Sequence, residues 1–220
     1  MTLWKYAFRL LLLAGVAGAL ADNSSQPVQV PKGSPPAVDG KISADEWRDA
    51  ARQELIGGGE LRLKHDGAHL YVGIRGLKPG WSHVYVTDGD AVHVLHASAA
   101  LGTAIYRQGA SGAWQPIQSF TWAMRGTSHT EEAIAAFLEA NGWYANNNRM
   151  GNPTEFEFKI TRRFLKGDTP RLTVAFAADA KSPQYWPATI SDDCLKQELL
   201  FGKTPPDLKF NMASWAKLKL

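Results

Sequence analysis

The sequence predicts an all-β protein, an antiparallel sandwich of two sheets that is jelly-roll-like in layout and carries one or two short helices. Two observations support this class. Short segments in which apolar and polar residues alternate recur along the chain, with glycine-rich turns between them. Only two segments have the caps and spacing of helices. Besides a hairpin at residues 60–74, strands are expected near residues 81–87, 91–96, 103–107, 114–123, 154–161, 171–178 and 214–220.

The hairpin at residues 60–74 has the clearest pattern. Asp66-Gly67 favours a two-residue type I′ turn, and closing the chain there pairs Leu63 with Leu70 and Leu61 with Val72. Alternation then divides the side chains between two faces. The face expected in the core carries Leu61, Leu63, Leu70, Val72 and Ile74. The opposite face carries Arg62, Lys64, His69 and Tyr71.

Two short helices are expected. The first runs from Ser43 to Ala50, because Ser43 and Glu46 have the spacing of a capping box, and Trp47 would lie on its inward side. The second runs from Thr130 to Ala140, with acidic residues in its first turn and Asn141-Gly142 as its stop.

The first 21 residues have the features of a signal peptide. Lys5 and Arg9 precede an apolar stretch from Leu10 to Leu20 that is short for a bilayer span, and Ala19-Leu20-Ala21 fits a cleavage site. We therefore expect cleavage after Ala21, a periplasmic or secreted protein, and no stable membrane insertion afterwards. Residues 22–35 are polar and proline-rich and form an extended lead-in, and residues 36–220 form one domain.

Composition narrows the functional classes. The 220 residues are 45% hydrophobic and 20% charged, as in an ordinary globular protein and unlike a disordered or polytopic membrane chain. The formal charge is only +3, and it decreases once Lys5 and Arg9 leave with the leader. No basic stripe therefore remains to bind nucleic acid. The single cysteine, Cys194, excludes an internal disulfide and any multi-cysteine metal site.

The segment from Pro36 to Trp47 reads P-x-V-D-G-x-I-x-x-x-E-W. This pattern at the start of a β-sandwich resembles the opening of family 9 carbohydrate-binding modules and their DOMON-like relatives. The resemblance extends over most of residues 36–220, through Leu70-Tyr71-Val72, Asp90 to Val94 (with His93 where an acid is usual), Glu155 to Ile160, and Trp215 to Leu220. It implies a two-sheet sandwich that binds a sugar, or in some relatives a haem, at one rim or face.

The resemblance assigns no ligand-binding residue to this chain. For the opening segment we favour a structural role, in which Gly40 allows the turn, Asp39 caps it and Trp47 fills core volume.

Aromatic side chains are the main indication of a ligand. Eight tryptophans is a high number for this length, and exposed flat rings stack on the apolar faces of pyranose rings. Alternation places Trp81, His83 and Tyr85 on one face of a strand and Val84 and Val86 on the other. The aromatic face is either an exposed platform or buried under a further layer. A second aromatic cluster comprises Trp114, Phe120 and Trp122.

A third aromatic segment, Trp143-Tyr144, precedes Asn146-Asn147-Asn148-Arg149. We expect this segment to be a loop after the second helix, either merely solvated or offering amide and guanidinium groups to sugar hydroxyls. Tyr185-Trp186 is a fallback platform. The candidate ligand-binding residues are therefore Trp81, His83, Tyr85, Trp143, Tyr144, Asn147, Arg149 and Trp186.

Metal and haem sites are less favoured alternatives. His83 approaches His96 if a hairpin turns at Asp88-Gly89, but isolated surface histidines are the simpler interpretation. Residues 88–90 and 191–193 are acidic loops of the kind that bind calcium, although plain turns are favoured there too. Haem would need an axial ligand such as a histidine, Met124 or Met150.

Catalysis has weaker support than binding. Glu155 and Glu157 share one strand face about 7 Å apart, within the span of an inverting carboxylate pair. Neighbouring solvent-face glutamates are common on strands, however, and no nucleophile motif accompanies them. We therefore predict no catalytic residue and no metal ligand.

The sequence is best interpreted as an exported, non-catalytic protein that binds an oligo- or polysaccharide and works beside a glycan-degrading enzyme. The alternatives are a periplasmic DOMON-like haem or redox carrier, and a structural or interaction domain without a small ligand. A structural calcium ion is compatible with each of them.

Overall fold

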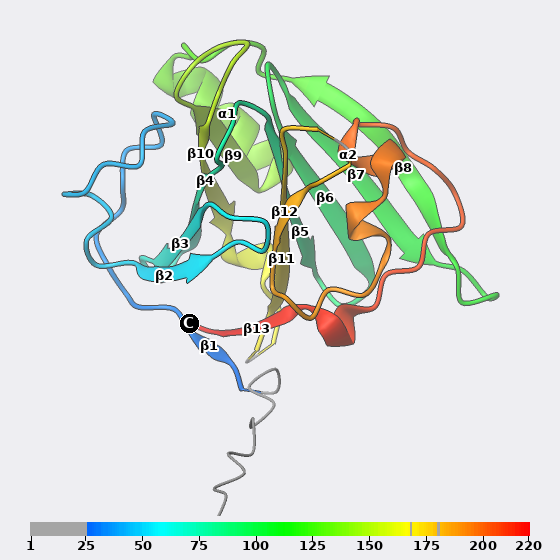
Figure 1. Ribbon diagram of the computed structural model, residues 1–220. Coiled ribbons are helices and arrows are strands. Elements are labelled where there is room, and N and C mark those ends of the chain that lie inside the picture. The colour runs from blue at the N-terminus through cyan, green and yellow to red at the C-terminus, as the bar shows by residue number, and fades with distance from the viewer. Residues whose placement is uncertain (1–25, 168, 180) are drawn as a thin grey trace, which may run out of the picture.

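The computed structural model describes residues 26–167, 169–179 and 181–220. Within them, two sheets pack face to face and helices are few, which confirms the predicted all-β sandwich (Figure 1). The expected leader at residues 1–21, its cleavage site, and residues 22–25 of the lead-in lie outside the described residues. No helix in the described part of the chain combines the length and apolar character needed to cross a membrane.

The larger sheet has eight strands and is antiparallel except where β1 runs parallel to β13. Its strand order is β1 (Val28–Gln29), β13 (Ala216–Lys219), β11 (Arg171–Ala177), β5 (Trp81–Thr87), β6 (Ala91–Ala97), β7 (Leu101–Gln108) and β8 (Trp114–Ala123). The short strand β12 (Gln184–Trp186) also pairs with β11.

The smaller sheet has five antiparallel strands. Its order is β2 (Ala51–Glu54), β3 (Glu60–His65), β4 (His69–Arg75), β10 (Glu155–Thr161) and β9 (Trp143–Asn147). The sequence missed β1, β2, β9 and β12. The Trp143 segment, predicted as a loop, is a fully buried strand, because its asparagine side chains find partners inside the protein.

The main core fills the space between the two sheets. Alternate side chains of both sheets meet there, since a strand directs every second residue to the same face. The smaller sheet contributes Leu61, Leu63, Leu70, Val72, Ile74, Phe156, Phe158 and Ile160. The larger sheet contributes Val84, Val86, Leu95, Leu172, Val174, Phe176 and Leu218.

The β3–β4 hairpin confirms the predicted faces but not the predicted register. Leu63 pairs with Val72 and Leu61 with Ile74, so the pairing is shifted by two residues from the expected one. A type I′ turn needs positive φ at both central residues, and only Gly67 has it, at 101°. Asp66 instead turns the chain by accepting hydrogen bonds from the amides of Ala68 and His69. A shift by an even number of residues leaves every side chain on its expected face.

Residues 38–50, here called the N-terminal cover, lie on the outer face of the smaller sheet. Trp47, 1% exposed, packs there with Ile42 and Tyr71, so its inward packing is confirmed. The predicted helix from Ser43 to Ala50 is wrong, since the segment is a series of turns. Glu46 does pair with Ser43, but its carboxylate also accepts the Ala37 amide and ties the segment to the preceding chain.

Residues 190–215, here called the C-terminal cover, lie on the outer face of the larger sheet. They include η3 (Asp193–Leu195), α2 (Gln197–Leu200) and η4 (Met212–Ser214). Their buried side chains form a second apolar cluster with that outer face. The cover contributes Cys194, Leu199, Leu200, Leu208, Phe210 and Trp215 to this cluster. Both outer faces of the sandwich are therefore covered.

The second predicted helix is confirmed as α1 (Glu131–Asn141), which packs beside β9 (Figure 1). Thr130 is its N-cap and Gly142, with φ of 76°, ends it in the left-handed conformation. The 3-10 turn η2 (Arg162–Phe164) follows β10, and Arg163 donates to the carbonyls of Glu139 and Ala140 at the end of α1.

Replacing Thr130 with alanine is expected to lower the free energy of unfolding by about 1 kcal/mol, because the Ala133 amide loses the Thr130 hydroxyl as its acceptor. Thermal melting of the variant beside Ser128→Ala, an exposed hydroxyl outside the helix, measures this effect. Equal melting temperatures for the two variants would contradict the capping role.

Candidate functional site

The expected platform of Trp81, His83 and Tyr85 is not exposed. The three side chains share one face as predicted, but His83 and Tyr85 are completely buried. The C-terminal cover lies over them, and the Tyr85 hydroxyl donates to the Cys194 carbonyl at 2.7 Å. The prediction of a platform was wrong because alternation cannot show that a segment more than a hundred residues away covers this face. Trp81, at the end of the strand, remains partly exposed.

The expected site at Trp143, Tyr144, Asn147 and Arg149 is likewise buried except for Arg149. Trp143 stacks on Phe158 with ring centroids 6.0 Å apart and donates its indole N–H to Thr103. The Asn147 amide donates to the Ser98 carbonyl at 3.0 Å, which ties β9 to the larger sheet. These residues therefore stabilise the sandwich, and only Arg149 faces solvent.

Trp186 is 6% exposed and lies beside a cavity of about 330 Å³. Trp215, Pro187, Thr189 and Lys217 also line this cavity. Both tryptophan rings are nearly buried, so neither offers a face on which a sugar could stack.

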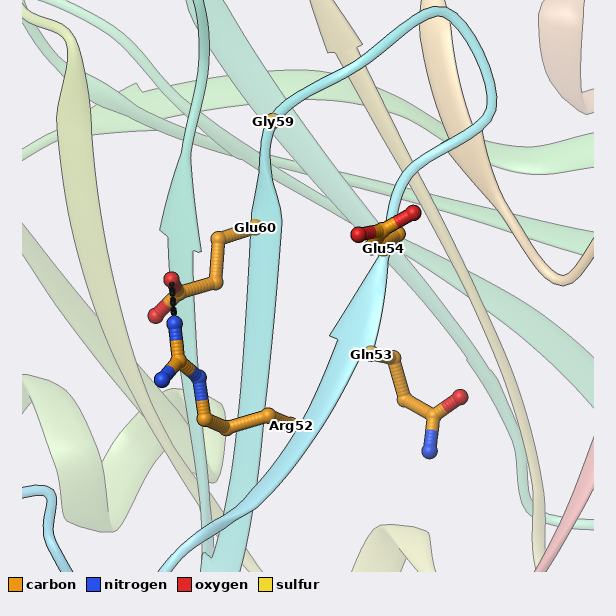
Figure 2. Close-up of a pocket in the computed structure, with 5 residues that line it drawn as sticks. All are labelled: Arg52, Gln53, Glu54, Gly59 and Glu60. Carbon is orange, nitrogen blue, oxygen red and sulfur yellow. Dashed lines mark hydrogen bonds and ion pairs between the residues drawn. The ribbon is translucent and has the colours of Figure 1, made fainter.

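A cavity of about 320 Å³ lies beside the β2–β3 hairpin and is lined mainly by charged and polar side chains (Figure 2). Arg52 donates to Glu60 at 2.6 Å. Arg62, which lies two residues after Glu60 on β3, pairs with the same carboxylate. Gln53 and Glu54 complete the wall. The principal charges are already paired with each other and no aromatic ring lines the cavity, so it is a poor stacking site.

A third cavity, here called the aromatic cleft, has a different lining. Its volume is about 230 Å³, and it is lined by Trp81, His96, Ser98, Trp122, Leu200 and Phe201. Trp122 and Phe201 are 48% and 49% exposed, whereas His96 is only 4% exposed and forms the floor. The cleft thus combines half-exposed aromatic rings at its mouth with a polar imidazole at its base.

The Trp122 ring is held in place from two sides. A Cβ atom added to Gly102 would lie 2.8 Å from this ring, and one added to Gly202 would also lie 2.8 Å from it. Phe120 stacks on the same ring with centroids 5.3 Å apart. Two glycines, one on β7 and one in the C-terminal cover, therefore leave room for a ring that is fixed and still half exposed. A preorganised ring loses little entropy on binding.

His83 and His96 form a buried pair beneath this cleft. They are direct partners in the β5–β6 register, and His96 Nδ1 lies 2.7 Å from His83 Nε2. The interpretation of isolated surface histidines was therefore wrong. Burial lowers the pKa of His96 to about 3, and burial together with His96 holds the pKa of His83 well below its usual value. Both rings are neutral at ordinary pH.

Glu155 and Glu157 do not form an open carboxylate pair. Glu157 accepts the Trp47 indole N–H at 2.6 Å and the Gly40 amide at 2.7 Å, and Glu155 accepts the Ile42 amide at 2.9 Å. Burial raises the pKa of Glu157 to about 7, although the hydrogen bonds from Trp47 and Gly40 act to lower it. The two carboxylates anchor the N-terminal cover through the Gly40 amide, the Ile42 amide and the Trp47 indole.

The two acidic loops serve as turns and anchors. Asp88 accepts the amides of Asp90 and Ala91, and Asp192 accepts the Cys194 amide and the Trp215 indole N–H. Among the described residues, no three histidine, cysteine or acidic side chains meet as a metal site.

A haem fits the aromatic cleft poorly. Pockets that enclose drug-sized ligands begin at about 300 Å³, and a porphyrin exceeds the 230 Å³ of this cleft. Met124 lines a neighbouring cavity with Trp122 and Arg125 and is not among the residues that line the aromatic cleft.

Of the predicted site residues, only Trp81 lines the aromatic cleft. Trp122 belonged to an aromatic cluster visible in the sequence, and only the structure shows that it lies on the edge strand β8. His96 and Phe201 gave no local signal, because strands and loops distant in sequence bring them together. Comparison of the chain with protein-family models, with curated proteins and with solved structures finds no match.

Proposed function

We propose that this protein is exported and binds carbohydrate without catalysing a reaction, as an accessory to glycan-degrading enzymes, and that the sugar binds in the aromatic cleft. The observation that carries the proposal is Trp122, a half-exposed ring fixed between Gly102 and Gly202. The resemblance of residues 36–220 to family 9 carbohydrate-binding modules supports the same class of ligand.

The cleft suits a pyranose ring in two respects. The apolar face of a pyranose stacks on a flat aromatic ring, and Trp122, Trp81 and Phe201 supply such rings around one opening. Sugar hydroxyls need polar partners, and His96 and Ser98 supply them on the same lining. The volume of about 230 Å³ matches one or two sugar units rather than a long groove, so the end or a short stretch of a glycan is the expected ligand.

Replacing Trp122 with alanine is expected to weaken glycan binding several-fold, because stacking on one aromatic ring contributes on the order of 1 kcal/mol. A glycan-array survey followed by calorimetric titration of the best ligand measures the change. Ile117→Ala is the matched control, since Ile117 is 52% exposed on the same strand but does not line the cleft.

Equal affinities of wild type and Trp122→Ala for the glycan would show that the sugar does not bind in the aromatic cleft. If no glycan on the array binds wild type, the carbohydrate proposal falls, and a structural or interaction domain becomes the better interpretation. Melting curves on each variant ensure that lost binding is not lost folding.

A further inference from the structure

A small cavity, here called the arginine pocket, shares the Trp122 ring with the aromatic cleft. Its volume is about 120 Å³, and it is lined by Ala100, Trp122, Ala123, Met124 and Arg125. Trp122 also lines the aromatic cleft, so the two cavities are neighbours along one surface. A glycan with one unit against Trp122 in the cleft therefore has an adjoining unit within reach of the arginine pocket.

The turn at residues 98–100 belongs to both cavities. Ser98 lines the aromatic cleft, and Ala100, two residues later, lines the arginine pocket. Ser98 closes the turn by donating its hydroxyl proton to the Ala100 carbonyl at 3.2 Å and its amide proton to the same carbonyl at 3.1 Å. The two cavities therefore share this turn as well as the end of β8.

Contacts on both sides of Arg125 hold its backbone in place. Met124 has a φ of 49°, a left-handed conformation that is unfavourable for a residue with a Cβ atom, and its side chain packs against the main core. The Gly126 amide donates to the Ala99 carbonyl at 3.0 Å, which ties the chain to the turn at residues 98–100. The Arg125 side chain thus extends from a fixed position beside Trp122.

The charge around this surface is positive. Arg125 is exposed and forms no ion pair with a described residue. Arg149 is also exposed and unpaired in the same sense, and its backbone amide donates to the Asn147 side chain, which in turn donates to the Ser98 carbonyl. No described acidic residue lines either cavity. A guanidinium presents parallel N–H donors that match the two oxygens of a carboxylate.

We propose that the arginine pocket is a second subsite of the glycan site and that it binds a uronate, a sugar unit that carries a carboxylate. Arg125 pairs with this carboxylate while the adjoining sugar unit stacks on Trp122 in the aromatic cleft. Arg125 is then the residue that determines specificity, and Arg149 adds positive charge nearby. This inference rests on the proposed carbohydrate function of the cleft.

The effect of charge is tested with disaccharides of glucuronate, galacturonate and mannuronate, each compared with its methyl ester. The ester keeps the ring and the hydroxyls but carries no charge. In calorimetric titration at low salt, we expect at least one acid to bind roughly ten-fold more tightly than its ester, because charge-assisted hydrogen bonds are stronger than neutral ones. This preference should shrink as sodium chloride is raised, since Arg125 is exposed to solvent. Esters that all bind as tightly as their acids at low salt would overturn the inference.

Arginine variants locate the effect. Arg125→Gln should abolish the preference for the acid and leave the affinity for the ester unchanged, and Arg125→Lys should keep part of it, because an ammonium lacks the planar fork. Arg149→Gln should lower the preference less, since Arg149 lines neither cavity. Arg107→Gln is the matched control, because Arg107 is exposed on β7 and lines neither cavity. Equal losses for Arg125→Gln and Arg107→Gln would show that the overall charge, and not the arginine pocket, attracts the acid.

The outcomes separate this inference from the proposed function. If Trp122→Ala weakens acid and ester alike while Arg125→Gln changes neither affinity, the glycan site stands and the uronate subsite is refuted. If no acid, no ester and no glycan on the array binds the folded wild type, the carbohydrate function fails, and the uronate subsite fails with it.

Discussion

Replacing Trp47 with alanine should lower the free energy of unfolding by about 3–5 kcal/mol, the range for a buried tryptophan whose removal leaves a cavity. Only 1% of the Trp47 side chain is exposed. Its ring packs so closely on Gly73 that a Cβ atom added to this glycine would lie 3.2 Å from it. The change would also remove the indole donor of the buried Glu157 carboxylate, which adds the cost of an unsatisfied polar group.

Denaturant titration of Trp47→Ala and Trp122→Ala compares the loss in free energy of unfolding for the same substitution at a buried and at a half-exposed tryptophan. Trp122 is 48% exposed, so its loss should cost less than half as much. Trp47→Phe separates the two contributions, because it restores most of the volume without the N–H donor. Similar stability losses for Trp47→Ala and Trp122→Ala would mean that the N-terminal cover does not hold Trp47 in a core.

The second large effect is a pH dependence of stability that comes from Glu157. Its pKa is about 7 in the folded protein, against an ordinary value of 4.5. Between these two values the folded state holds a proton that the unfolded state has released, so the contribution of Glu157 falls as pH rises from about 4.5 to 7. A shift of this size corresponds to about 3 kcal/mol.

Glu157→Gln removes the titrating carboxyl. Comparing wild type with this variant therefore isolates the Glu157 contribution from that of other titrating groups. His83 and His96 act with the opposite sign, because their lowered pKa values make the folded state lose stability as pH falls below about 6.5. Both proteins contain these histidines, so their contribution cancels in the difference between wild type and variant. We expect that difference, measured by urea unfolding from pH 5 to 8, to shift by about 3 kcal/mol in favour of the variant as pH rises. A difference that does not change with pH would show that Glu157 is ionised throughout.

Local patterns in the sequence identified most of the strands, though not β1, β2, β9 or β12, and they identified the side chains that share a face. Alternation in residues 60–74 assigned Leu61, Leu63 and Leu70 to the core even though the pairing is shifted by two residues, because faces repeat with a period of two. Thr130 and Gly142 bounded α1 correctly, because helix caps are satisfied by neighbours three or four residues away. The structural role assigned to Gly40 and Trp47 also followed from their residue types.

Only the tertiary structure decided what lies on each face. The C-terminal cover turns the strand face of His83 and Tyr85 from an expected platform into a core. The N-terminal cover buries Lys64 and Tyr71, which the sequence placed on the hairpin face opposite the main core. The aromatic cleft depends on strands β5, β6 and β8 meeting α2 and the residue that follows it. Alternation along a strand shows which side chains point the same way, but contacts between segments a hundred residues apart arise from packing of the whole chain, and they leave no period in the sequence.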